Sequence, residues 1–123
     1  MINQLRTELQ TRLNSIEGLS SGRAKADDVI EENEIYYGYE LTYTNDGYDK
    51  GYDYEEYSIT LTGRLVSKNK SIAIMDSMAQ EIAKVLKDLR FKTTIQDVTQ
   101  YDKINKLIIN GRVKMNTINY KLR

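Results

Sequence analysis

The sequence contains no cysteine, histidine, proline or tryptophan among its 123 residues. Without cysteine it has no disulfide, no thiolate zinc site and no cysteine nucleophile. Without histidine it lacks the commonest general base and metal ligand, and a Ser-His-Asp triad is excluded. Catalysis would have to rely on carboxylates, lysine, tyrosine or a cofactor. These absences favour a protein that is not an enzyme.

Long apolar runs are missing as well. No stretch approaches the ~20 apolar residues that are needed to cross a bilayer. The first eight residues, MINQLRTE, predict the start of a helix rather than a secretory signal. The length falls within the usual range of one domain. The sequence therefore predicts a soluble intracellular protein with a single domain over residues 1–123.

The charge is balanced overall but divided along the chain. Residues 27–57 hold eleven acidic residues and one basic residue, whereas residues 58–123 hold thirteen basic and five acidic residues. The simplest interpretation is two solvated faces of opposite sign. The alternative is a subunit whose acidic part meets the basic part of a neighbouring copy, as in head-to-tail rings.

Two segments show the three- and four-residue spacing of apolar side chains that is typical of an amphipathic helix. The first covers residues 2–16, and its apolar residues are Ile2, Leu5, Leu9, Leu13 and Ile16. The second covers residues 71–90, begins at a capping serine, and has the apolar residues Ile72, Met75, Ala79, Ile82, Leu86 and Leu89. Residues 17–34 contain turn formers and an acidic run, and predict a connection.

Alternating apolar and polar residues predict the strands. Residues 35–66 form a predicted β-hairpin whose polar, glycine-containing segment 45–53 is a protruding loop. Alternation returns in residues 91–97 and 106–118, which predict two more strands. The predicted fold is α+β, with a single mostly antiparallel sheet of about four strands packed against two helices. Its order is α-β-β-α-β-β.

Eight of the ten tyrosines lie between residues 36 and 57. A strand tyrosine can pack its ring while its hydroxyl remains at the solvent. Alternatively the tyrosines form a contact surface, an interpretation that Tyr48, Tyr52 and Tyr54 favour because they lie in or beside the predicted loop. A stacking platform for single-stranded nucleic acid is disfavoured, because the interleaved carboxylates would repel phosphate.

The charged residues offer three further candidate sites. Asp46, Asp49 and Asp53 could hold a calcium ion, but their spacing does not match the twelve-residue calcium loop. The paired glutamates are adjacent in sequence, so they point to opposite sides and form no facing acid-base pair. Arg112 and Lys114 share a strand face, yet the sequence has no helix-turn-helix signature or glycine-rich phosphate loop.

No catalytic residue, metal or cofactor is predicted from these patterns. The candidate functional residues are instead those of a protein–protein interface. They are Tyr48, Tyr52, Tyr54, Asp46, Asp49, Asp53, Arg112 and Lys114.

The order of elements resembles a family of phage proteins. It consists of the opening helix, the strand EYSITLTGRLV at residues 56–66, the helix from Ser71 through Leu86 and a two-stranded end. This order resembles the tail terminator, or tail completion, proteins of long-tailed phages and of related prophage or tailocin-type elements. The resemblance covers nearly the whole chain, and it implies no catalytic residues.

The resemblance implies a small α+β subunit that closes into a six-membered ring. Such a ring caps the finished tail tube and presents a surface to the neck or head connector. The expected partners are other copies of the chain, the tail tube protein and the neck or connector protein, while DNA passes through the ring without specific binding. The expected location is the host cytoplasm during assembly and then the virion. An acidic channel lining would suit this passage, so the 45–53 loop is expected to face the lumen or the tube.

Other functions remain open at the level of the sequence. One is another head–tail joining protein of the same element. A second is a monomeric, acidic and tyrosine-rich binding or inhibitor module that mimics nucleic acid. A third is an enzyme that uses carboxylates and a bound metal, which would show a metal-dependent melting temperature.

Overall fold

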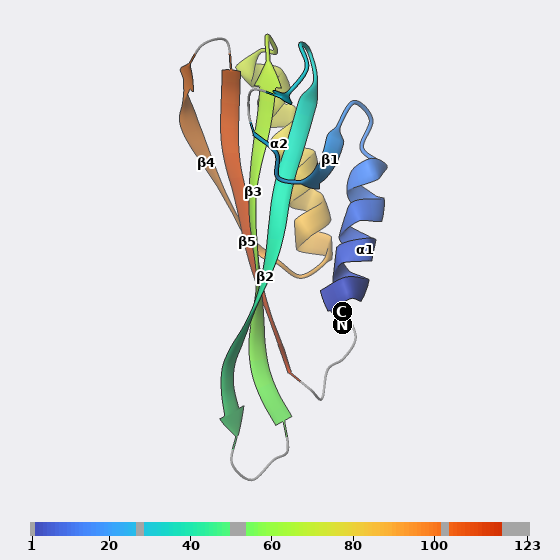
Figure 1. Ribbon diagram of the computed structural model, residues 1–123, viewed down its shortest axis with the longest axis vertical. Coiled ribbons are helices and arrows are strands. Elements are labelled where there is room, and N and C mark those ends of the chain that lie inside the picture. Colours follow the sequence, from blue (N-terminus) through green and yellow to red (C-terminus); the bar gives the residue numbers. More distant parts are fainter. Residues whose placement is uncertain (1, 27–28, 50–53, 102–103, 117–123) are drawn as a thin grey trace.

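The computed structural model describes the backbone of residues 2–26, 29–49, 54–101 and 104–116. The fold is α+β, with two helices and one five-stranded sheet in the order β1-β2-β3-β5-β4 (Figure 1). The elements are α1 (Ile2–Asn14), β1 (Ser20–Arg23), β2 (Ile35–Asp49), β3 (Tyr54–Lys68), α2 (Ile72–Asp88), β4 (Lys92–Tyr101) and β5 (Ile104–Asn116). Among the residues described, no helix is long and apolar enough to span a bilayer.

The predicted connection at residues 17–34 contains an additional strand. β1 pairs in parallel with β2, from Ser20 opposite Tyr36 to Arg23 opposite Tyr39. Its sequence, SSGR, has no apolar alternation, so the pattern that reveals a half-buried strand is absent from it. The prediction of about four strands was therefore wrong in this detail. The sheet is mixed, and the order of elements is α-β-β-β-α-β-β.

Residues 45–49 of the predicted loop 45–53 are strand. β2 continues to Asp49 and β3 begins at Tyr54, with Asn45 opposite Tyr57 and a register shift before Gly47 that marks a β-bulge at Asp46. Backbone hydrogen bonds sustain an antiparallel pair without apolar side chains, which explains why a polar segment forms strand. The two strands run on together past both helices (Figure 1). Residues 50–53 lie outside the described part.

Both ends of α2 are set by local hydrogen bonds. Ser71 accepts a bond from the amide of Ile74 at 3.3 Å and caps the first turn. At the other end Arg90 takes a left-handed conformation with a φ of 72°, and the amide of Phe91 donates to the carbonyl of Leu86 at 2.9 Å. This is a Schellman ending, so α2 stops before the predicted boundary at residue 90.

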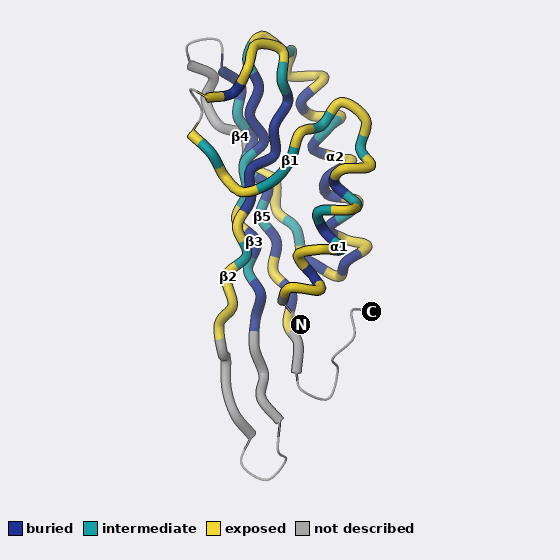
Figure 2. The backbone as a smooth tube through the Cα atoms, turned by 45° about the vertical axis from the view of Figure 1, so that its right-hand side comes forward, coloured by how far each residue is buried: buried dark blue, intermediate teal, exposed yellow. Residues whose placement is uncertain are grey.

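The helices cover one face of the sheet and form the main core (Figures 1 and 2). From α1 come the fully buried Leu5, Leu9 and Leu13, and from α2 come Met75, Ala79, Ile82 and Leu86. The strands contribute odd-numbered residues, which are Ile35, Tyr37, Tyr39, Ile59, Leu61, Leu65, Leu107, Ile109 and Val113. Ile72 was predicted on the apolar stripe of α2 but remains 47% exposed, since it lies in the first turn.

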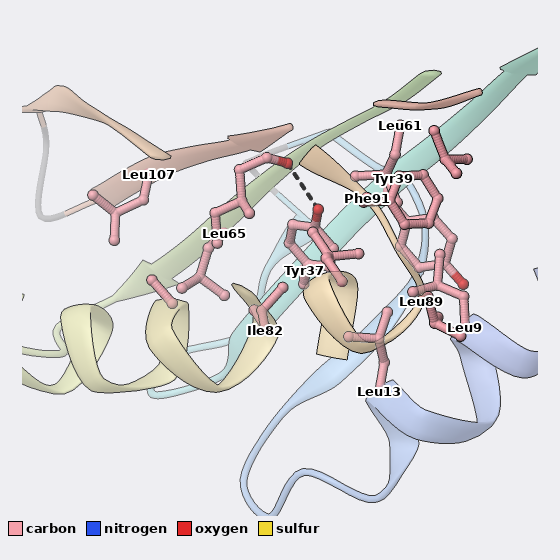
Figure 3. Close-up of a cluster of buried hydrophobic side chains, with 14 of the residues drawn as sticks. Leu9, Leu13, Tyr37, Tyr39, Leu61, Leu65, Ile82, Leu89, Phe91 and Leu107 are labelled. Carbon is pink, nitrogen blue, oxygen red and sulfur yellow. Dashed lines mark hydrogen bonds between the residues drawn. The ribbon is translucent and has the colours of Figure 1, made fainter. Parts of the chain in front are cut away.

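The hydroxyl of Tyr37 bonds to the sheet from within the core. It donates to the backbone carbonyl of Ile109 at 2.8 Å (Figure 3). The ladder between β3 and β5 is interrupted here, and the amide of Gly63 donates instead to Oδ1 of Asn110 at 3.1 Å. A Cβ atom on Gly63 would lie 2.5 Å from Cζ of Tyr37. Glycine at this position therefore makes room for the buried ring.

The connection between β1 and β2 crosses the opposite face of the sheet (Figure 1). Its Ile30 packs with Tyr36, Val66 and Ile104 in a second, smaller cluster. The Tyr36 hydroxyl donates to the carbonyl of Arg23, and the Lys25 ammonium lies 4.4 Å from the centre of the Tyr36 ring. This connection covers one end of the face and leaves the rest uncovered (Figure 2).

Tyr37→Phe is expected to lower the free energy of unfolding by about 1–3 kcal/mol, because the buried carbonyl of Ile109 loses its donor. Tyr39→Phe is the matched control. The Tyr39 hydroxyl bonds to the side chain of Gln10, which is partly exposed and can turn to water. Urea unfolding of both variants should show the larger loss for Tyr37→Phe. An equal or smaller loss would contradict the role given to this bond.

Candidate functional site

Four of the eight predicted interface residues lie on the described extension of the β-hairpin. We call residues 45–57 the acidic ribbon, because this segment holds five acidic residues and one basic residue. Asp46, Tyr48 and Asp49 are on the β2 side of the ribbon, and Tyr54 opens β3. Their backbone is described but their side chains are not. Tyr52 and Asp53 lie outside the described residues, as does the geometry of the suggested calcium site.

Arg112 and Lys114 lie together on β5, as predicted. Both side chains are exposed on the face away from the helices. Arg112 donates from Nε and Nη2 to Oγ of Ser58 at 3.3 and 3.1 Å, which holds the guanidinium against β3 and buries the serine. Lys114 is opposite Ser58 in the β3–β5 register. These two cations therefore lie beside the base of the acidic ribbon.

The register of the sheet adds three basic side chains to this face. We call its uncovered part the open face, formed by residues Glu40, Thr42, Thr60, Thr62, Arg64, Lys92, Thr94, Gln96, Lys106, Ile108, Asn110, Arg112 and Lys114. It holds five basic side chains and one acidic side chain, Glu40. Lys92 is directly opposite Arg112. Alternation within each strand predicts which face a residue takes, but only the pairing of distant strands brings these cations together.

Two edges of the sheet are free of paired strands within the part of the chain that the structure describes. One is the outer edge of β4, since β4 pairs only with β5. The other is the edge of β2 from Glu40 onward, since β1 covers residues 36–39 alone. The edge of β1 itself is shielded by α1, because Nε2 of Gln10 donates to the carbonyl of Ser21 at 3.3 Å. Free edges present unpaired backbone donors and acceptors to another chain.

A groove of about 540 Å³ lies beside the free edge of β2. One wall comes from α1, and the others come from β1 and β2. Its lining residues are Arg6, Thr7, Gln10, Thr11, Arg23, Tyr39, Glu40 and Leu41. Arg6 and Arg23 give this groove two exposed cations at the point where the edge of β2 becomes free.

The tyrosines divide between core and surface. Tyr36, Tyr37 and Tyr39 are buried, with Tyr37 and Tyr39 stacked at 5.7 Å between ring centres, whereas Tyr43 is 48% exposed. Burial raises the pKa of all three buried phenols. The neighbouring Tyr39 raises the pKa of Tyr37 further, while the Arg6 guanidinium partly offsets the rise for Tyr39. These three tyrosines are structural, and the surface interpretation applies only to those further along the hairpin.

Within the described residues no group of three or more carboxylate, imidazole or thiol side chains is placed to hold a metal ion. The described surface thus presents charged side chains and free strand edges to a partner. Comparison of the sequence with protein-family models and with curated proteins found no match.

The buried tyrosines predict a loss of stability in alkali. Their folded pKa values lie above the ordinary value near 10, so the unfolded chain releases protons first and stability falls as the pH rises above ~10. Each tyrosine that stays protonated in the folded state contributes a slope of up to about 1.4 kcal/mol per pH unit. Urea unfolding across this range should show a shallower slope for Tyr37→Phe. An identical slope would contradict the assignment.

Proposed function

We propose that this protein is a structural subunit that forms a ring at the head-proximal end of a phage-type tail. The ring caps the tail tube and joins it to the neck or head connector. The subunit is made in the host cytoplasm and becomes part of the virion. Its partners are other copies of itself, the tail tube protein and the neck protein, and DNA passes through the ring without specific binding. It is not an enzyme.

One observation carries the proposal. Within the described residues the sheet has two edges without a paired strand, and the acidic ribbon and the open face carry opposite charges in the sequence. β4 contributes Lys92 to the basic open face, opposite Arg112 of β5, and the free edge of β2 continues into the acidic ribbon. A surface that complements a different surface of the same chain gives a head-to-tail contact, and such contacts close into a ring when the rotation between copies permits. Opposite charges then guide the encounter and fix the register.

The same geometry suits a neck protein of the same element. The two functions differ in what the ring does to a growing tail tube. A terminator stops growth at the finished length and permits head attachment. A neck protein is required for joining, whereas tube length remains normal without it. A tail-completion assay with measured tube lengths separates them.

Arg112→Glu combined with Lys114→Glu is expected to weaken self-association by roughly tenfold or more, because two cations on the open face become anions. The matched control is Lys84→Glu with Lys87→Glu, which makes the same change in net charge at exposed sites on α2. Solution mass against concentration measures the effect, and melting curves confirm that both variants fold.

Mixing the Arg112/Lys114 variant with a chain that carries Asp46→Lys and Asp49→Lys should restore part of the association, since the charges are then exchanged between partners. Equal behaviour of the open-face variant and the α2 control would contradict a contact through the open face. Tail completion should fail with the open-face variant and proceed with the α2 control.

A further inference from the structure

The two free edges are similar in length. The β4–β5 register is regular over residues 92–98 and shifts before Tyr101. The edge of β2 becomes free at Glu40, and its register with β3 is regular up to Asn45, before the bulge at Asp46. The regular stretches are therefore seven residues on β4, 92–98, and six residues on β2, 40–45. Edge strands of this kind are templates for pairing with another chain.

The strand directions suit an antiparallel contact between copies. β3 runs opposite to β2, β5 opposite to β3, and β4 opposite to β5, so β4 and β2 run in opposite directions within one molecule. A second copy placed beside the first in the same orientation thus brings its β2 antiparallel to β4. The sheet continues from copy to copy, and the helices of every copy remain on the same side.

Two exposed apolar side chains define the register. Tyr43 on the free edge of β2 is 48% exposed, and Ile95 on β4 is 39% exposed. Tyr43 is opposite the buried Ile59, and Ile95 is opposite the buried Ile109, so both side chains lie on the helix side of the sheet. When Ile95 is placed opposite Tyr43 of the next copy, these two apolar side chains form a contact between the cores of the two copies. Pairs of an aromatic and a β-branched residue stabilise antiparallel sheets.

The same register brings residues of opposite charge to neighbouring positions. It places Lys92 beside the bulge at Asp46, at the start of the acidic ribbon. It also brings Asp97 opposite Leu41, at the groove that holds Arg6 and Arg23. Opposite charges across a strand pair stabilise it.

We propose that copies of this chain join by extending the sheet, with residues 93–98 of β4 paired antiparallel to residues 40–45 of β2 in the next copy and Ile95 opposite Tyr43. The contact uses two different edges, so it is head-to-tail and propagates around a ring. It rests on the self-association in the proposed function and specifies the surfaces and the register. Six paired residues form a small contact, so closure of the ring adds to its stability.

Cysteine cross-linking tests this register, because the chain has no cysteine of its own. Ile95→Cys and Tyr43→Cys are made as separate chains, and both replaced residues are exposed in the single chain. Under a mild oxidant, a mixture of the two should give a disulfide-linked dimer, since directly opposed residues of antiparallel strands come close to disulfide reach. The chain with both substitutions should give a ladder of linked oligomers.

The control is Ile74→Cys, which lies on α2 and is 45% exposed. Mixed with Tyr43→Cys, it should cross-link at least about tenfold more slowly than Ile95→Cys does. Efficient cross-linking of Ile95→Cys to itself would overturn the proposal, because it would show β4 pairing with β4 about a two-fold axis. Equal rates for Ile95→Cys and the control would overturn it as well.

The outcomes separate this register from the proposed function. If rings form and respond to charge reversal on the open face, but Ile95→Cys and Tyr43→Cys do not cross-link, the register is wrong and the ring-forming function stands. If the wild-type chain forms no oligomer and Ile95→Cys does not cross-link to Tyr43→Cys, the register and the ring-forming function are both wrong. A third outcome is that Ile95→Cys cross-links specifically to Tyr43→Cys while tail completion does not depend on the protein. This outcome would support the contact between copies and reject the tail function.

Discussion

The packing of this fold depends on the hydrogen bond from the Tyr37 hydroxyl to the Ile109 carbonyl. A phenol in the middle of an apolar core must find an acceptor, and here it takes one from the sheet itself. The β3–β5 ladder opens to allow this, Asn110 accepts from the amide that the opening frees, and Gly63 leaves space for the ring. The two helices then close over the tyrosine and exclude water.

Both helices pack on the side of the sheet that holds Tyr37. The opposite face carries the cations Arg64, Lys92, Lys106, Arg112 and Lys114. The β2–β3 hairpin runs beyond the helices, and backbone pairing joins its two strands there. A basic face, an acidic ribbon and two edges without a paired strand among the described residues support the proposal that copies of the chain associate.

Much of the fold could be predicted from periodicity alone. The stripe of Leu5, Leu9 and Leu13 and the alternation around Tyr37 determined the helices, the hairpin and the buried face. β1 could not be predicted, because SSGR pairs through its backbone and carries no apolar signal. The strand character of residues 45–49 was missed because their polarity is typical of loops, whereas the ladder needs only amides and carbonyls. Arg112 and Lys114 were predicted to share a face, but Lys92 joins them only through a register between β4 and β5 that local sequence does not encode.

We propose that copies of this chain associate head-to-tail through charged, complementary surfaces. The solution mass of the purified protein over a range of protein and salt concentrations, with electron micrographs of the same samples, tests this association. Closed rings are expected, with masses that are multiples of the 14.3 kDa chain, and they should dissociate as salt rises. A single 14.3 kDa species at every protein concentration in low salt would contradict this proposal.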